Sequence, residues 1–223
     1  MGRNLEKDAI EMAAKNQRIL ENGFRIFAEN SIEKVTMSDV AKAAGVAVSS
    51  LYRYYNTKPT LVVAISTWAW NEYTKENARK ATESGKPDRT AAEMFDFYLE
   101  SFLDLYYNHK NLLRFNQFFN TYLLSETVSE EERVPYIDMI RGLEARFGGI
   151  YDKGLQDGTL RTDIPEKQLF SLTLHLMLAI VTRYAIGLVY QNDKTDPETE
   201  LRMQKVYSTA SSAVDTIPRL REV

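Results

Sequence analysis

The sequence predicts an all-α protein of about nine helices, with an N-terminal three-helix domain over residues 1–58 and a larger helical domain over residues 59–223. Apolar residues recur three and four positions apart through most of the chain, which is the spacing of one helix face. The sequence shows no sustained alternation of apolar and polar residues between turn residues, the mark of a half-buried strand. Glycine and proline interrupt the helical spacing and mark the expected helix ends.

The first expected helix covers residues 8–29 and places three apolar side chains on its inner face: Leu20, Phe24 and Phe27. The second expected helix is short and begins after Thr36, which has Asp39 three residues later, the spacing of a capping box. Gly45 follows this helix, where a sharp turn requires a positive φ that a side chain would penalise. Val46 is placed to fill the angle between the second and third helices.

The third expected helix resumes at Ser49, and its inward positions are Leu51 and Tyr55. Thr57 is suited to cap the helix after it, and Pro59 lies in that helix's first turn, where a missing N–H costs nothing. The outward positions carry one aliphatic side chain besides hydroxyl, aromatic and guanidinium groups: Val48, Ser49, Ser50, Tyr52, Arg53 and Tyr54. Two short helices joined by a glycine turn, with such a face on the second, suit the major groove of double-stranded DNA. For a bare glycine-turn pattern, a plain helical hairpin with solvated polar residues is the alternative.

Two kinds of DNA contact are expected from this segment. Lys58 lies at a helix N-terminus, where its charge and the backbone N–H groups both favour a phosphate. Val48 is suited to touch a thymine methyl group, and Arg53 to hydrogen-bond a guanine. We therefore expect base contacts from Val48, Ser49, Ser50 and Arg53, and phosphate contacts from Thr36, Tyr52, Tyr54 and Lys58.

Residues 36–58 resemble the DNA-binding domain of TetR-family transcriptional regulators, and the close likeness covers about residues 15–65. The matching positions are Thr36, Val40-Ala41, Ala44-Gly45-Val46, Leu51-Tyr52, Tyr54-Tyr55 and Lys58. The chain departs from the family pattern in three places. Ala47 stands where the family usually has serine, so the recognition helix loses its standard N-cap. Tyr55 replaces phenylalanine, and Asn30-Ser31 replaces the glycine after the first helix, asparagine being the next-best residue for a left-handed position.

Six further helices are expected, at residues 59–83, 89–107, 111–125, 134–156, 165–191 and 198–217. The stretch 84–87 breaks the first of them from the next, and Asp157-Gly158 is a helix-end signal. Residues 126–133 are acidic and polar, and we expect them to form a loop.

The run of residues 169–190 has about the length of a membrane span. It contains His175 and Arg183, and a charge at the centre of a span is costly in lipid, so we expect no membrane partner.

An apolar helix of this kind needs burial on two sides. The resemblance implies that the last two helices of each subunit form a four-helix homodimer interface; the alternative is that they close the monomer core. A two-fold pair of modules would read a near-palindromic operator with half-sites about 34–36 Å apart.

The resemblance also implies that the C-terminal domain binds a small-molecule effector, and we expect a repressor that the effector releases. Aromatic residues are dense enough in this domain to line an apolar pocket, so an apolar or aromatic effector is expected. The candidate pocket residues are Trp68, Tyr98, Phe102, Phe115, Phe119, Tyr122, Phe147, Tyr151 and His175. Asn116, Gln117 and Arg183 are further polar groups suited to orient a ligand. Aromatic stripes at helical spacing are also what a plain core requires.

The amino-acid composition limits which other classes of protein and which kinds of site this chain can contain. The 223 residues are 44% hydrophobic and 26% charged, as in soluble globular proteins, and contain no cysteine, which excludes disulfides and cysteine nucleophiles and fits a reducing cytoplasm. The net charge is −3, but residues 1–58 carry nine Lys and Arg against seven Asp and Glu, so the predicted DNA-binding part is basic. The sequence holds no phosphate loop, nucleophile elbow or zinc-protease motif and only two histidines, so we expect no enzyme, metal or cofactor.

A second hypothesis assigns the chain to a different functional class from DNA-binding regulators. The chain could be a helical small-molecule-binding or protein-interaction module with a vestigial helix-turn-helix. The missing serine cap at Ala47 and the acidic isoelectric point of about 5.6 are the features that favour it. Retention of specific DNA discriminates the two hypotheses.

Overall fold

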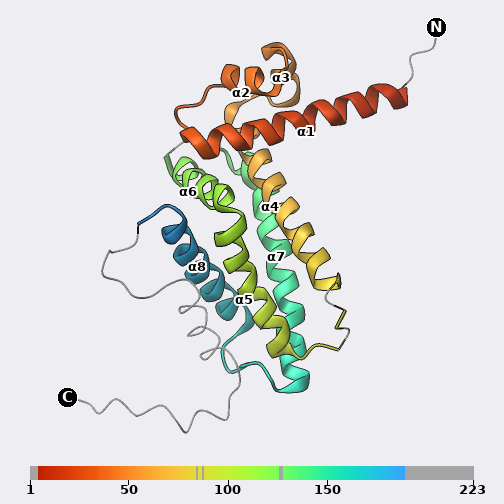
Figure 1. Cartoon of the computed structure of the whole chain (residues 1–223), viewed down its shortest axis with the longest axis vertical. Helices are drawn as coiled ribbons and strands as arrows, with labels where there is room; N and C mark the ends of the chain where they lie inside the picture. The colour runs from red at the N-terminus through yellow and green to blue at the C-terminus, as the bar shows by residue number, and fades with distance from the viewer. Residues whose placement is uncertain (1–4, 84, 87, 126–127, 189–223) are drawn as a thin grey trace. The chain divides into compact units, whose positions relative to one another are not determined.

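The computed structural model describes residues 5–83, 85, 86, 88–125 and 128–188, and these residues form eight α-helices (Figure 1). The helices are α1 (Leu5–Asn30), α2 (Met37–Ala44), α3 (Val48–Tyr54), α4 (Lys58–Glu83), α5 (Ala91–Asn108), α6 (Lys110–Ser125), α7 (Glu130–Asp157) and α8 (Glu166–Ala185). The predicted all-α class with an N-terminal helix-turn-helix is confirmed. The ninth expected helix, at residues 198–217, lies outside the described residues. The chain divides into unit 1, residues 1–80 with 105–142, and unit 2, residues 81–104 with 143–223.

Two helices begin at capping boxes that the sequence analysis did not use. The Ser129 amide donates to Glu132 Oε2 at 3.0 Å, and the Glu132 amide donates to Ser129 Oγ at 3.2 Å. This box starts α7 at residue 130, so the expected loop over residues 126–133 was too long. At the start of α5, the Thr90 amide donates to Glu93 Oε2 at 2.9 Å and the Glu93 amide to Thr90 Oγ1 at 3.2 Å. Each box satisfies amides that have no partner inside the helix.

Two helix ends also differ from expectation, and each has a residue with positive φ. Helix α8 ends at residue 185 rather than near 191, because Gly187 adopts a φ of 78° and its amide donates back to the Tyr184 carbonyl at 3.2 Å. The Leu188 amide reaches the Arg183 carbonyl at 3.0 Å, which completes a Schellman motif. After α1 the left-handed residue is Ser31, with a φ of 67°, while Asn30 stays helical.

The core of unit 1 gathers α1, α2 and α3 together with α4 and α6. Figure 1 shows α2 and α3 on one side of α1, with α4 and α6 on the other. Phe24 on α1 lies at the centre of this arrangement, with its ring centroid 6.1 Å from that of Trp68 on α4 and 5.4 Å from that of Phe115 on α6. The packing of α1 against α4 and α6 therefore fixes the platform on which the two short helices rest.

The core of unit 2 is aromatic and centred on Phe147 of α7. Its ring centroid lies 6.0 Å from that of Phe95, 5.6 Å from that of Tyr98 and 5.5 Å from that of Phe170. The Asp157 carboxylate receives the Ala91 amide at 2.7 Å and so joins the end of α7 to the start of α5. These contacts join residues 91–104 of α5 and 143–157 of α7 to α8 within unit 2.

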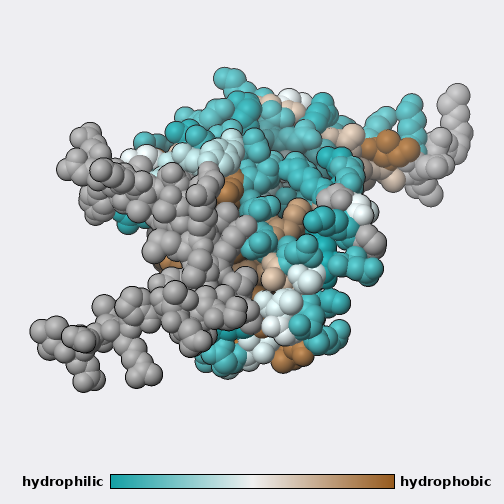
Figure 2. Space-filling model, turned by 60° about the horizontal axis from the view of Figure 1, so that its bottom comes forward, coloured by the Kyte–Doolittle hydropathy of each residue, from teal (hydrophilic) through white to brown (hydrophobic). Residues whose placement is uncertain are grey.

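The face in Figure 2 is predominantly hydrophilic, with separate hydrophobic residues among the polar ones. Within the described ranges, no helix is both long enough and apolar enough to span a bilayer. In the same ranges, histidine, aspartate and glutamate side chains form no cluster of three or more that could hold a metal ion.

Candidate functional site

Helix α2 begins at a capping box formed by Thr36 and Asp39. The Thr36 amide donates to Asp39 Oδ2 at 2.9 Å, and the Asp39 amide donates to Thr36 Oγ1 at 3.2 Å. The Thr36 hydroxyl donates to the same carboxylate at 2.6 Å. These hydrogen bonds stabilise the charged carboxylate and hold the pKa of Asp39 below its usual value. The capping box expected from the sequence is confirmed.

The turn between α2 and α3 depends on Gly45, which has a φ of 64°. Its amide donates to the Lys42 carbonyl at 3.2 Å, and the Val46 amide donates to the Ala41 carbonyl at 3.0 Å. This pair of bonds is a Schellman motif, and the left-handed conformation at its glycine is the one that a side chain would strain. Val46 is partly buried against the core, as expected for a residue in the angle between the two helices.

Two tyrosines attach α3 to α1. Leu51 and Tyr55 are 0% and 8% exposed, which confirms their predicted inward positions. The Tyr55 hydroxyl donates to Asn16 Oδ1 at 2.7 Å, and the Tyr54 hydroxyl donates to the Met12 carbonyl at 3.2 Å. Both acceptors belong to α1, so this helix holds the end of α3 in place.

The predicted base-contacting residues lie on the outer side of α3. Val48, Ser49 and Arg53 are exposed, and Ser50 is half-buried. All four side chains therefore belong to the helix that a major groove would receive, while Leu51 of the same helix is buried.

The predicted phosphate-contacting residues are divided between exposed and half-buried positions. Thr36 and Tyr52 are exposed, and Tyr54 is half-buried because it also contacts α1. Lys58 is half-buried: its Nζ donates to the Glu33 carbonyl at 3.4 Å and lies 5.8 Å from the centroid of the Tyr122 ring.

Helix α3 lacks a side-chain cap. Ala47 occupies the N-cap position with a φ of −66° and a ψ of 144°, and within the described residues it makes no side-chain cap hydrogen bond. Replacing Ala47 by Ser would supply an acceptor at a position that already has the extended conformation of an N-cap. We expect the free energy of unfolding to rise by about 1 kcal/mol. Chemical denaturation measures the difference; a Thr in place of Ser should give a similar gain, and a loss in both variants would contradict the assigned cap.

Glu132 is a residue that the sequence analysis placed in a loop and that instead joins two helix N-termini. Its Oε1 accepts hydrogen bonds from Thr57 Oγ1 at 2.8 Å and Thr60 Oγ1 at 3.1 Å, while its Oε2 accepts the Ser129 amide at 3.0 Å. Thr57 in turn accepts the Thr60 amide at 3.2 Å, so it caps α4 as expected. The Ser-x-x-Glu pattern at residues 129–132 is the signal that could have found this role.

Glu132 should also make stability depend on pH. The hydrogen bonds from Ser129, Thr57 and Thr60 lower the pKa of Glu132 below the 4.5 of an unperturbed group. A depressed folded-state pKa contributes stability above the unfolded pKa, and this contribution is lost as the pH falls through the folded pKa. We expect Glu132→Gln to be less stable than the parent chain at neutral pH, with the difference shrinking below about pH 4.5. Melting temperatures measured across this pH range test it; a difference that stays constant into acid would contradict the assignment.

The nine predicted pocket residues divide between the two units. In unit 1, Trp68 is half-buried, whereas Phe115, Phe119 and Tyr122 lie in the core that also holds α1. In unit 2, Tyr98, Phe102, Phe147 and Tyr151 belong to helices α5 and α7, and His175 is exposed on α8. Burial raises the pKa of the Tyr98 hydroxyl, and this hydroxyl has no hydrogen-bond partner within the described residues. His175 Nδ1 lies 3.3 Å from the Ser171 hydroxyl. The assignment of these residues to a ligand pocket stays a prediction.

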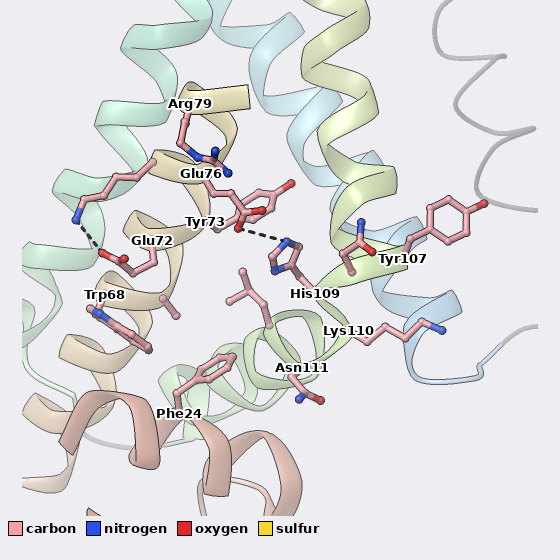
Figure 3. Close-up of a pocket in the computed structure, with 14 residues that line it drawn as sticks. Phe24, Trp68, Glu72, Tyr73, Glu76, Arg79, Tyr107, His109, Lys110 and Asn111 are labelled. Atoms are coloured by element: carbon pink, nitrogen blue, oxygen red, sulfur yellow. Dashed lines mark hydrogen bonds and ion pairs between the residues drawn. The ribbon is translucent and has the colours of Figure 1, made fainter. Parts of the chain in front are cut away.

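Of these nine residues, Trp68 lines a pocket in unit 1 that also receives Phe24 from α1 and His109 from the segment between α5 and α6 (Figure 3). The other predicted residues do not line that pocket. His109 and the charged residues around it were not among the predicted ligand-binding residues, because they lie at helix ends and on exposed faces where periodicity carries no signal.

The N-terminal region of the chain is similar to known proteins in its sequence. Residues 19–65 match the family model described as bacterial regulatory proteins, tetR family. The chain is similar to an HTH-type transcriptional regulator of Staphylococcus aureus (strain bovine RF122 / ET3-1), with 37% identity over 57 residues. That match spans 26% of this chain and 29% of the relative's own length, so it concerns the helix-turn-helix region.

Solved structures match over a longer part of the chain. A putative transcriptional regulator from Saccharomonospora viridis, in complex with choline, superposes with a TM-score of 0.69 at 15% identity and covers 89% of this chain and 100% of that one. The regulator FadR from Bacillus subtilis, in complex with stearoyl-CoA, superposes with a TM-score of 0.66 at 19% identity, covering 85% of this chain and 95% of that one. At these identities the likeness shows the fold. Over residues 19–65, the region of the helix-turn-helix, the chain therefore matches the tetR family of bacterial regulatory proteins.

Proposed function

We propose that this protein is a homodimeric, sequence-specific DNA-binding repressor that an apolar or aromatic small molecule releases from its operator. The observation that carries the proposal is the helix-turn-helix at residues 36–58, which has a complete capping box, a Schellman turn and an exposed polar face on α3. The family match over residues 19–65 supports it. We assign DNA recognition to residues 1–58, and effector binding and dimerisation to residues 59–223.

In this proposal α3 enters the major groove of double-stranded DNA. Val48, Ser49, Ser50 and Arg53 contact base edges, which is where sequence is read. Thr36, Tyr52, Tyr54 and Lys58 contact phosphates, which set register and supply most of the salt-dependent affinity. Val48 and Tyr52 are 40% and 46% exposed, so both side chains are accessible to a DNA duplex.

The dimer is proposed to form through the last two helices. Helix α8 exposes Leu172 and Leu176, which are 55% and 42% exposed and lie one turn apart, and Ala179 continues the same face. A helix face of this kind favours burial against another helix. Two-fold symmetry would then present two copies of α3 to a near-palindromic operator.

The effector is proposed to be an apolar or aromatic small molecule, and no cofactor is assigned. Proteins of the same fold were crystallised with stearoyl-CoA and with choline, so the fold accommodates small molecules of different chemistry. The aromatic residues of both units supply apolar surface for such a ligand. Release requires that the ligand bind the DNA-incompetent state more tightly than the DNA-competent one.

Replacing Lys58 by Ala tests the proposed phosphate contacts. We expect weaker binding to all duplexes, specific and non-specific alike, because a phosphate contact carries no sequence information. The slope of log affinity against log salt should flatten by about one unit, since one counterion fewer is released. Fluorescence anisotropy at several salt concentrations measures the slope. Arg141→Ala, which removes one exposed positive charge elsewhere in unit 1, is the control for net charge; equal slopes in all three proteins would contradict the assignment.

A further inference from the structure

Unit 1 contains a pocket of about 740 Å³ whose walls come from three parts of the chain (Figure 3). Phe24 comes from α1, residues 68–79 come from one face of α4, and residues 107–112 come from the end of α5 and the start of α6. Its size is that of pockets that hold small organic molecules in proteins. None of the expected functions of the helix-turn-helix uses this pocket.

One end of the pocket is apolar and aromatic. Figure 3 shows Trp68 and Phe24 together at this end, and their ring centroids are 6.1 Å apart in an edge-to-face arrangement. Tyr73 and Leu112, 6% and 4% exposed, complete the apolar surface. Such a surface suits the hydrocarbon or aromatic body of a ligand.

The rest of the lining is mostly polar, and its cationic side chains outnumber its carboxylates. The cationic side chains are Lys75, Arg79 and Lys110, and the carboxylates are Glu72 and Glu76. Both carboxylates already have a lysine partner: Lys75 Nζ lies 2.8 Å from Glu72 Oε1, and Lys80 Nζ lies 2.8 Å from Glu76 Oε1.

His109 belongs to the same polar part of the pocket. Its Nε2 lies 3.8 Å from Glu76 Oε2, so this carboxylate has a second potential cation beside it. Figure 3 shows Arg79 at the end of the pocket away from Phe24 and Trp68, with Glu76 and His109 between them. The pocket is therefore apolar at one end and has Arg79 at the other, and its lining as a whole carries three cationic side chains and two carboxylates.

We propose that this pocket is the effector site, and that it takes an apolar or aromatic molecule with one anionic head group, such as a carboxylate. The body lies against Phe24 and Trp68, and the head group lies toward Arg79, with Lys110 adding positive charge to the lining. Guanidinium and ammonium groups bind carboxylates through charge-assisted hydrogen bonds, and arginine does so in a bidentate geometry. As an effector site the assignment rests on the proposed regulatory function; as a ligand site it stands on the pocket alone.

The same geometry couples the pocket to the DNA-reading helix. Phe24 lies on α1, the helix whose Asn16 side chain and Met12 carbonyl accept the hydroxyls of Tyr55 and Tyr54. A ligand that displaces the Phe24 ring acts on the helix that holds the end of α3. A ligand that contacts Phe24 differently in two conformations of the helix-turn-helix would shift the equilibrium between them.

Three probes that share one body test the charge preference: phenylbutanoate, phenylbutanol and phenylbutylammonium. Isothermal titration calorimetry on the full chain should rank their affinities with the carboxylate first, the alcohol second and the ammonium last. The double variant Arg79→Glu, Lys110→Glu should change the ratio of carboxylate to ammonium affinity by at least about tenfold, toward the ammonium. Arg141→Glu, an exposed charge reversal outside the pocket, should leave the ranking unchanged.

DNA binding, measured without and with phenylbutanoate, separates the two levels of the proposal. Phenylbutanoate should change the DNA affinity of the parent chain and leave that of the double variant unchanged. A failure of the chain to bind DNA, with the charge ranking intact, would overturn the regulatory function and leave the ligand site. Absence of binding by all three probes, or a ranking that the double variant does not alter, would overturn the ligand site while DNA binding stands. Carboxylate binding that changes no DNA affinity would overturn the coupling through α1.

Discussion

Replacing Arg53 by Ala is expected to lower operator affinity by about 1–3 kcal/mol and to relax the base preference at one position of each half-site. Arg53 is exposed on α3, whereas Leu51 of the same helix is buried, so its guanidinium is available to a base edge. A guanidinium that spans the two acceptors of guanine makes the commonest specific contact in the major groove. Its loss should therefore affect one base pair more than the others.

The measurement is a set of binding curves on the operator and on operators with each base pair changed in turn. For Arg53→Ala, the operator and the variant changed at the contacted position should bind with similar affinity, while the other positions keep their preferences. The Lys58→Ala protein is the matched comparison, because it should lose affinity on every duplex by a similar factor. A uniform loss for Arg53→Ala would identify a phosphate contact instead and contradict the assignment.

Replacing Gly154 by Ala is expected to destabilise the protein by about 1–3 kcal/mol. Gly154 is buried in the last turns of α7, and a Cβ placed on it would lie 2.7 Å from the Cβ of Leu160, which is itself 2% exposed. A Cβ is fixed to the backbone, so rotation of the leucine side chain cannot relieve this contact. The segment that returns from α7 would have to move away from the helix.

Gly149, on the same helix, provides the matched control. A Cβ on Gly149 meets no atom of the described residues within 4 Å, and the residue is exposed. Gly149→Ala should therefore stabilise the protein by about 0.5–1 kcal/mol, because alanine is the better helix former. Urea denaturation of the two variants should give changes of opposite sign. The same sign in both would contradict the close packing of Gly154 against Leu160.

Local signals in the sequence predicted the helix-turn-helix closely. The capping box at Thr36 and the left-handed glycine at Gly45 are short-range features, in which residues a few positions apart determine the backbone. The boxes that start α5 and α7 have the same form, and using them would have placed the beginning of α7 at residue 130. Likewise Gly187 marks the end of α8, although the apolar run continues beyond it.

The candidate ligand pocket was much harder to predict. Aromatic residues at helical spacing mark a buried face, and Phe115 and Phe119 are fully buried in the core of unit 1. A pocket arises where such a face is incompletely covered, and this depends on which helices meet. His109 and Lys110 line the pocket because α5 ends and α6 begins beside α4, a tertiary fact that no spacing within either helix contains.

The claim that this chain reads DNA as a symmetric dimer is tested most directly by selecting random duplex DNA on the purified protein. A Tyr54→Ala, Lys58→Ala double variant serves as the control. We expect enrichment of an inverted repeat with half-sites about 34–36 Å apart, and no enrichment with the control. No enriched sequence at low salt, or the same sequence enriched by the control, would contradict the account and favour a helical binding module with a vestigial helix-turn-helix.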